Sequence, residues 1–253
     1  MSDRLDLTVT YTMHNALRRE LRHLAQAAAR ADPDPRRVLR TAAGWELFRR
    51  ALHAHQAAED DALWPALRRA LKGRPFDLTR LEAIEAEHAA LASVLGAIDT
   101  ALIDPGVGPE LFGELADSLI IGLEGHLDHE EQAVFPLVQA VLTQDQWEHF
   151  GRAHAQRIEP HAARLLPWLL DGADERTAGS VLAQLLPEPA HEVYTRQWWP
   201  AYAALDRWGA ARAAARAAAP TPAPVPGAAV RYWPLPLPFP LPFPVPPSTR
   251  SPS

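Results

Sequence analysis

Residues 126–136 read HLDHEEQAVFP, and residues 55–65 read HQAAEDDALWP. Aligned on their prolines, both stretches follow the pattern His-x-x-x-Glu-(Asp/Glu)-x-x-x-(Trp/Phe)-Pro. In each copy the histidine and the glutamate are one helical turn apart, so both side chains can reach the same point beside a helix. The two copies therefore predict two helices that contribute alike to one shared site.

The apolar residues around each copy indicate which way the pair points. Apolar side chains recur every three or four residues through 45–66 and through 119–141, and in both segments the histidine and the glutamate interrupt this stripe. Because the apolar stripe of a helix faces the core, both pairs should point inward. Single histidines interrupt the stripes of two more segments. The predicted ligands of the shared site are His14, His55, Glu59, His88, His126 and Glu130.

This set of residue types favours a dinuclear metal site. Six polar side chains in an apolar core would cost roughly several kcal/mol for each uncompensated charge, and bound metal ions remove that cost. Four imidazoles and two carboxylates that can bridge suit two iron or manganese ions better than one zinc ion. The chain has no cysteine, which excludes thiolate ligands, Fe–S clusters and disulfides.

Four further polar residues lie next to the predicted ligands. Asp60 and Glu131 directly follow the two glutamates, and we expect them to accept hydrogen bonds near the site or to add a bridge. Glu85 lies about one turn before His88 and could also reach the site. His129 lies about 60° from the midline of the apolar stripe of its helix, so we expect a supporting or exposed position.

Length and periodicity predict an all-α fold. Hydrophobic residues make up 47% of the 253 residues, and Ala and Leu dominate among them, which favours helices. Pro- and Gly-rich breaks separate four periodic segments, which favours an antiparallel up-down four-helix bundle over residues 1–142. The four segments are 8–30, 34–71, 78–103 and 109–142.

A helical extension is predicted over 143–212, packed on or beside the bundle. Thr143 and Gln146 form a capping-box pattern at the start of a helix that runs toward Leu170, and a Trp-rich last helix is expected over 189–210. On the first of these helices we expect His149, His154 and His161 on the surface, with a second metal site as the alternative. Residues 213–253 are Ala/Pro-rich and predict a disordered tail of polyproline II character, a docking segment for a protein partner.

Charge and hydropathy exclude other classes. The net charge of −6 argues against a nucleic-acid partner. The N-terminus lacks the pattern of a signal peptide, and no uninterrupted apolar run of membrane length occurs, since prolines interrupt residues 230–247. We therefore expect a cytoplasmic protein without a transmembrane segment.

On these residues, segment 8–142 resembles the hemerythrin-like family of HHE cation-binding domains, in its bacterial form with a C-terminal helical extension. The shared pattern is one His on helix 1, His-x-x-x-Glu on helix 2, one His on helix 3 and His-x-x-x-Glu on helix 4. The resemblance implies a non-haem di-iron centre with an oxo or hydroxo bridge, held by the six predicted ligands. Iron is favoured over manganese.

The chain departs from the oxygen-carrying hemerythrins in two respects. Those proteins have a second histidine four residues from the first on helix 3, where this chain has Ile84 and Ala92 around His88. They also bridge the irons with an Asp five residues after the helix-4 histidine, where the match here is Glu130 at four. The resemblance then implies a more open iron, which favours reaction with peroxide or sensing over reversible carriage.

The leading functional hypothesis is a di-iron protein that binds or reacts with oxygen, peroxide or nitric oxide, in oxidative-stress or iron handling. Catalase-like activity would make it an enzyme, and no catalytic residue is assigned. The alternative is a non-enzymatic iron or oxygen sensor that signals through its extension and Pro-rich tail. A ferritin-like oxidase is disfavoured, because that class uses Glu-x-x-His pairs.

Overall fold

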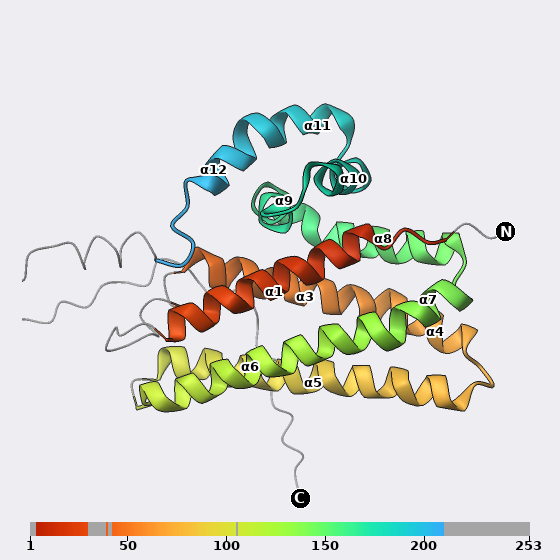
Figure 1. Cartoon of the computed structure of the whole chain (residues 1–253), viewed down its shortest axis with the longest axis horizontal. Coiled ribbons are helices and arrows are strands. Elements are labelled where there is room, and N and C mark those ends of the chain that lie inside the picture. Colours follow the sequence, from red (N-terminus) through yellow and green to blue (C-terminus); the bar gives the residue numbers. More distant parts are fainter. Residues whose placement is uncertain (1–3, 30–38, 40–41, 105, 210–253) are drawn as a thin grey trace, which may run out of the picture.

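The computed structural model describes residues 4–29, 39, 42–104 and 106–209, and over these ranges it contains helices and turns but no strand. Four long helical segments lie side by side (Figure 1). They are α1 (Thr8–Ala28); α3 (Ala43–Ala58) with the π-helical turn η1 (Glu59–Leu63) and α4 (Trp64–Ala70); α5 (Pro75–Ile103); and α6 (Pro109–His129) with the π-helical turn η2 (Glu130–Val134) and α7 (Phe135–Val141). The predicted all-helical bundle is confirmed.

The predicted helix ends differ from the observed ends in two places within the bundle. α5 begins at Pro75, earlier than predicted, because proline at the first helical position needs no hydrogen-bond acceptor for a backbone N–H. Helices 2 and 4 are each interrupted by a π-helical turn that the periodicity did not predict. The predicted start of helix 2 at Asp34-Pro35 lies outside the described residues.

The extension packs against α1 and α3, on the side of the bundle opposite α5 and α6 (Figure 1). Its elements are α8 (Gln144–Ile158), the 3-10 turn η3 (Glu159–His161), α9 (Ala162–Leu170), α10 (Glu175–Leu185), α11 (Glu188–Val193), the π-helical turn η4 (Tyr194–Trp198) and α12 (Trp199–Ala203). The capping box of Thr143 and Gln146 is present as predicted.

The last helix ends at Ala203, so its predicted continuation through residues 204–209 is wrong. The chain leaves the helix there and brings Trp208 onto the bundle, where its indole N–H donates to Glu20 Oε2 at 2.7 Å. Gly44 makes this contact possible, since a Cβ at that position would lie 2.4 Å from the indole nitrogen of Trp208. The Gly44 N–H also donates to the carbonyl of Arg207 at 2.8 Å.

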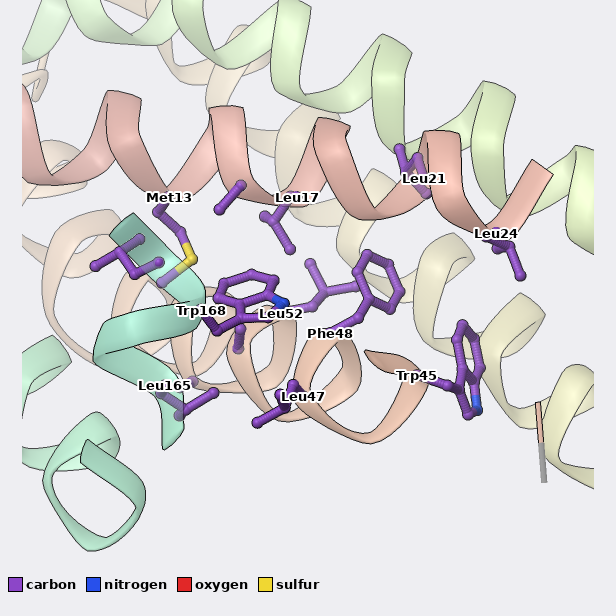
Figure 2. Close-up of a cluster of buried hydrophobic side chains, with 14 of the residues drawn as sticks. Met13, Leu17, Leu21, Leu24, Trp45, Leu47, Phe48, Leu52, Leu165 and Trp168 are labelled. Atoms are coloured by element: carbon purple, nitrogen blue, oxygen red, sulfur yellow. The ribbon is translucent and has the colours of Figure 1, made fainter. Parts of the chain in front are cut away.

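The apolar interior forms two clusters of buried side chains. The larger cluster joins α1, α3, α5 and α6 to the extension, and Figure 2 shows Trp168 of α9 beside Phe48 and Leu52 of α3. The smaller cluster lies toward the other end of the bundle and includes Trp64 and Phe135. Along α3, α5 and α6 the polar residues of the site lie where the residues of the larger cluster give way to those of the smaller one, so they form a layer at the boundary between the clusters.

α5 is long and apolar enough to cross a membrane by length and composition, with a mean hydropathy of 1.3 and 28% of its most apolar segment buried. The sequence analysis expected no transmembrane segment anywhere in the chain, because it found no uninterrupted apolar run of membrane length. In the structure α5 packs along α6 and directs the buried His88 toward the bundle centre. This is the arrangement of a bundle helix, and length and composition alone are weak evidence for a membrane span.

Candidate metal centre

Six polar side chains from the four bundle helices meet in the layer between the apolar clusters, and none is more than 7% exposed. They form two groups that share one carboxylate, and in each group the candidate ligand atoms lie within 4.8 Å of one another. One group is His14, His55, Glu59 and Glu130, and the other is His88, His126 and Glu130. The structure thus brings together all six residues that the sequence predicted as ligands.

Glu130 divides its two oxygens between two pairs of imidazoles. Its Oε2 lies 3.2 Å from His14 Nε2 and 4.0 Å from His55 Nε2. Its Oε1 lies 3.5 Å from His126 Nε2 and 3.9 Å from His88 Nε2. A carboxylate in this position can contribute one oxygen to each of two cation positions.

Glu59 is placed in the same way between the two groups. Its Oε1 lies 3.3 Å from His55 Nε2, and its Oε2 lies 3.6 Å from His88 Nε2. All four oxygens of Glu59 and Glu130 are buried and have no hydrogen-bond partner among the described residues. Buried carboxylates without partners are costly, and a cation between the imidazole pairs would satisfy these oxygens. The donor set therefore fits a metal centre.

The π-helical turns begin at these two glutamates. Trp64 N–H donates to Glu59 O and Phe135 N–H donates to Glu130 O, each five residues back. The following residues are Pro65 and Pro136, which lack an N–H and would clash with the carbonyl four residues earlier in a regular α-helix. The aromatic-proline pair of the sequence pattern is therefore the local cause of both turns.

In the absence of a cation, burial and neighbouring charges disfavour the charged forms of Glu59 and His55. Burial first, and then the charges of Glu130 and Asp60, raise the pKa of Glu59 well above its ordinary value. Burial and the neighbouring imidazoles hold the pKa of His55 well below its ordinary value. Both groups therefore favour their neutral forms, and a neutral imidazole is the form that binds metal.

A family model for the hemerythrin HHE cation binding domain matches residues 6–138, which is more than half of the chain. The chain belongs to this family. Comparisons with characterised proteins and with solved structures gave no further match. The HHE match ends before α8, so the helical extension lies outside it.

Around the candidate metal centre, three of the four inward-facing imidazoles place their other ring nitrogen within 2.9 Å of a carboxylate oxygen. His14 Nδ1 lies 2.8 Å from Glu131 Oε1, and His88 Nδ1 lies 2.9 Å from Asp60 Oδ1. Arg18 also donates to Glu131 at 2.7 Å. Such outer carboxylates fix the orientation of a ligand imidazole and raise its basicity. Asp60 and Glu131 thus lie where the sequence analysis expected supporting acceptors.

The third outer carboxylate was missed by the sequence analysis. Glu87 accepts from His126 Nδ1 at 2.9 Å and from His129 Nδ1 at 2.8 Å. The expected residue, Glu85, instead accepts a hydrogen bond from Arg68 of α4. Glu87 lies on the side of α5 that faces α6, and a neighbouring acid is too common on a helix for the sequence to single this one out.

The three histidines of α8 and η3 do not form a second metal site. His149 and His161 are exposed, as expected. His154 is only 3% exposed, so its predicted surface position is wrong. It lies where α8 packs against α3, and burial, Arg157 and His14 lower its pKa to about 4. Its ring is therefore neutral at neutral pH.

Proposed function

We propose that this HHE domain holds two iron ions and binds or reacts with a small ligand of the oxygen, peroxide or nitric oxide class. The observation that carries the proposal is the division of the Glu59 and Glu130 oxygens between two pairs of imidazoles. Two such carboxylates and four imidazoles suit a bridged pair of iron ions, with manganese as the less favoured metal.

When bound, the two metal ions would supply Lewis-acid and one-electron chemistry toward the small ligand. The residues of this chain hold, orient and enclose the site. Outer carboxylates keep the Nε2 atoms of their imidazoles pointing inward. Trp64 and Phe135 bring rings to within 5.9 Å of the His88 ring and 5.3 Å of the His14 ring, which limits water on that side.

The two cation positions differ in how closely Glu59 approaches them. Glu59 lies within 4.8 Å of every residue of the first group, whereas the second group, near which only its Oε2 lies at 3.6 Å from His88 Nε2, contains three residues. The second position is therefore the more open one, where a small ligand has room to bind. We assign no catalytic residue separate from the candidate metal ligands.

The test is a metal count followed by a ligand assay on the full chain. We expect two iron ions per chain in the iron-loaded protein, and no bound iron in the double variant His55→Ala, His126→Ala. The matched control is His149→Ala with His161→Ala, which removes two exposed histidines and should keep both ions. Equal metal content in the two double variants would refute the metal site.

Oxygen, hydrogen peroxide and nitric oxide are then added separately to the loaded protein. A visible spectrum that changes with oxygen and recovers on its removal indicates binding, whereas oxygen release from peroxide indicates a catalase-like reaction. Loaded protein that responds to none of the three ligands would refute this part of the proposal.

The second candidate is an iron or oxygen sensor that acts through the extension and a partner of the Pro-rich tail. It is favoured by the direct packing of α8 on α3 and η1, the elements that contribute His55 and Glu59. Limited proteolysis with and without iron is the test. Iron-dependent protection of residues 143–209 without consumption of peroxide supports a sensor, and protection that does not depend on iron contradicts it.

A further inference from the structure

His55 differs from the other three histidines of the centre. Its Nε2 faces the cluster, 3.3 Å from Glu59 Oε1, but its Nδ1 is buried and has no hydrogen-bond partner among the described residues. The other three histidines each place Nδ1 within 2.9 Å of a carboxylate oxygen. A buried donor without a partner is destabilising, so the environment of this nitrogen requires an explanation.

The neighbour on this side is His154 of the extension. The two rings have centroids 5.8 Å apart, with an interplanar angle of 55°. His154 is 3% exposed, and its Nε2 is also buried without a hydrogen-bond partner in the described part of the chain. The ring of Phe150 stacks on His154 at 6.2 Å with an interplanar angle of 4°, which orients it.

The two buried nitrogens, His55 Nδ1 and His154 Nε2, can act as hydrogen-bond donor and acceptor to each other. A metal-binding histidine that uses Nε2 carries its proton on Nδ1, and a neutral imidazole can accept a hydrogen bond at Nε2. One hydrogen bond would therefore satisfy both buried atoms. At this ring separation it forms after a small side-chain rotation or through one bridging water.

We propose that His154 is a positioning residue for His55, accepting the hydrogen bond of its Nδ1–H directly or through one water. This inference rests on the proposed function. His154 then holds Nε2 of His55 toward the cation position that His55 shares with His14. The partner is a neutral ring, whereas the other three ligand histidines have carboxylates.

The position of His154 makes the extension part of the centre. α8 packs against α3 and η1, and Arg157 of α8 donates a hydrogen bond to Asp61 of η1. The HHE match does not include α8, so this support comes from outside the matched domain. A shift of α8 would act first on the cation position of His55, whose ring lies beside His154, and less on the position of His88 and His126, so the extension has an unequal effect on the two positions.

The first test follows the imidazole N–H signals of His55 by NMR in ¹⁵N-histidine-labelled, zinc-loaded protein. Zinc serves as a diamagnetic probe. We expect a slowly exchanging Nδ1–H signal for His55 that moves in His154→Gln, where an amide can still accept, and exchanges rapidly in His154→Leu. His149→Leu, on the same helix but exposed, is the control and should leave the signal unchanged.

The second test measures stepwise iron affinity by chelator competition. Loss of an outer partner typically weakens metal binding about 10–100-fold, so His154→Leu should weaken one of the two steps by that factor. The His154→Gln variant should keep most of the iron affinity that His154→Leu loses. Unchanged affinities and an unchanged His55 signal in His154→Leu, or an equal loss at both steps, would overturn the inference.

The two proposals can fail separately. A wild-type chain that binds neither iron nor zinc would refute the proposed function. In that case the ring signals of His55 in the metal-free protein still report the contact, since they should respond to His154→Gln and not to His149→Gln. Absence of that response would refute the role of His154.

Discussion

Replacing Glu59 with glutamine should stabilise the metal-free protein and weaken the metal-bound one. Both Glu59 oxygens are buried without hydrogen-bond partners, and the side chain is 0% exposed. Burial, then Glu130 and Asp60, raise its pKa well above the unfolded value of 4.5. Glutamine keeps the shape of the side chain and removes the charge that the metal-free core disfavours.

The sign of the pH dependence follows from the raised pKa. The folded metal-free protein holds the Glu59 proton more tightly than the unfolded chain, so its stability decreases as pH rises above 4.5 toward the folded pKa. The Glu59→Gln variant has no titrating group at this position, so its stability does not decrease in this way as pH rises. A buried unsatisfied group costs about 1–3 kcal/mol, and 1 kcal/mol shifts the melting temperature of a protein this size by roughly 2–4 °C. The variant should therefore melt higher by about 2–12 °C near neutral pH, and by little at pH 4.

The assay is thermal unfolding with chelator and with excess iron, at pH 4 and pH 7.5. With iron, the rise in melting temperature should be smaller for Glu59→Gln than for the wild type, because one bridging carboxylate is lost. The control is Glu82→Gln, which removes the same charge from an exposed position on α5. A metal-free Glu59→Gln protein that melts at or below the wild-type temperature at pH 7.5 would refute the reasoning.

Three further changes test other parts of the structure. Gly44→Ala places a Cβ against the Trp208 indole and should cost about 1–3 kcal/mol in the free energy of urea unfolding, whereas Gly96→Ala, in open space, should not destabilise. Glu87→Gln should weaken iron binding about 10–100-fold with little change in the helical content measured by circular dichroism, and intact affinity would show that its hydrogen bonds do not matter to the site. The third change concerns Glu131, where burial alone would raise the pKa but His14 and Arg18 lower it to about 2. The charged Glu131 therefore contributes to stability above pH 4.5, and this contribution is lost as pH falls toward 2. Glu131→Gln should therefore show a smaller loss of stability between pH 5 and pH 3, and an unchanged acid transition would contradict this.

Periodicity was sufficient to predict the inward faces of the bundle helices. The stripes around His55 and His126 depend only on residue spacing along one helix, so they can be recognised without knowing the neighbouring helices. The two His-x-x-x-Glu pairs then indicate a shared site, because two matched interruptions of an apolar stripe rarely arise from surface chemistry. These local patterns led to the six residues that the structure brings together.

The roles that the sequence analysis missed could be recognised only from contacts between helices. Glu87 is identified by its distance to His126 on α6, and His154 by the packing of α8 on α3, and neither contact follows from spacing along one helix. The π-helical turns did have a local signal. An aromatic-proline pair inside a continuous apolar stripe marks the turn at Pro65 and Pro136, and the same pair recurs at Trp199-Pro200 after η4.

The polar layer between the two apolar clusters has a consequence for cooperativity. Each cluster buries its own side chains, so in the metal-free protein the two ends of the bundle can open as separate units with different free energies. Cations bound to side chains from all four helices would join these units into one. Native-state hydrogen exchange should then show two levels of protection, around Phe48 and around Trp64, that merge when iron is added.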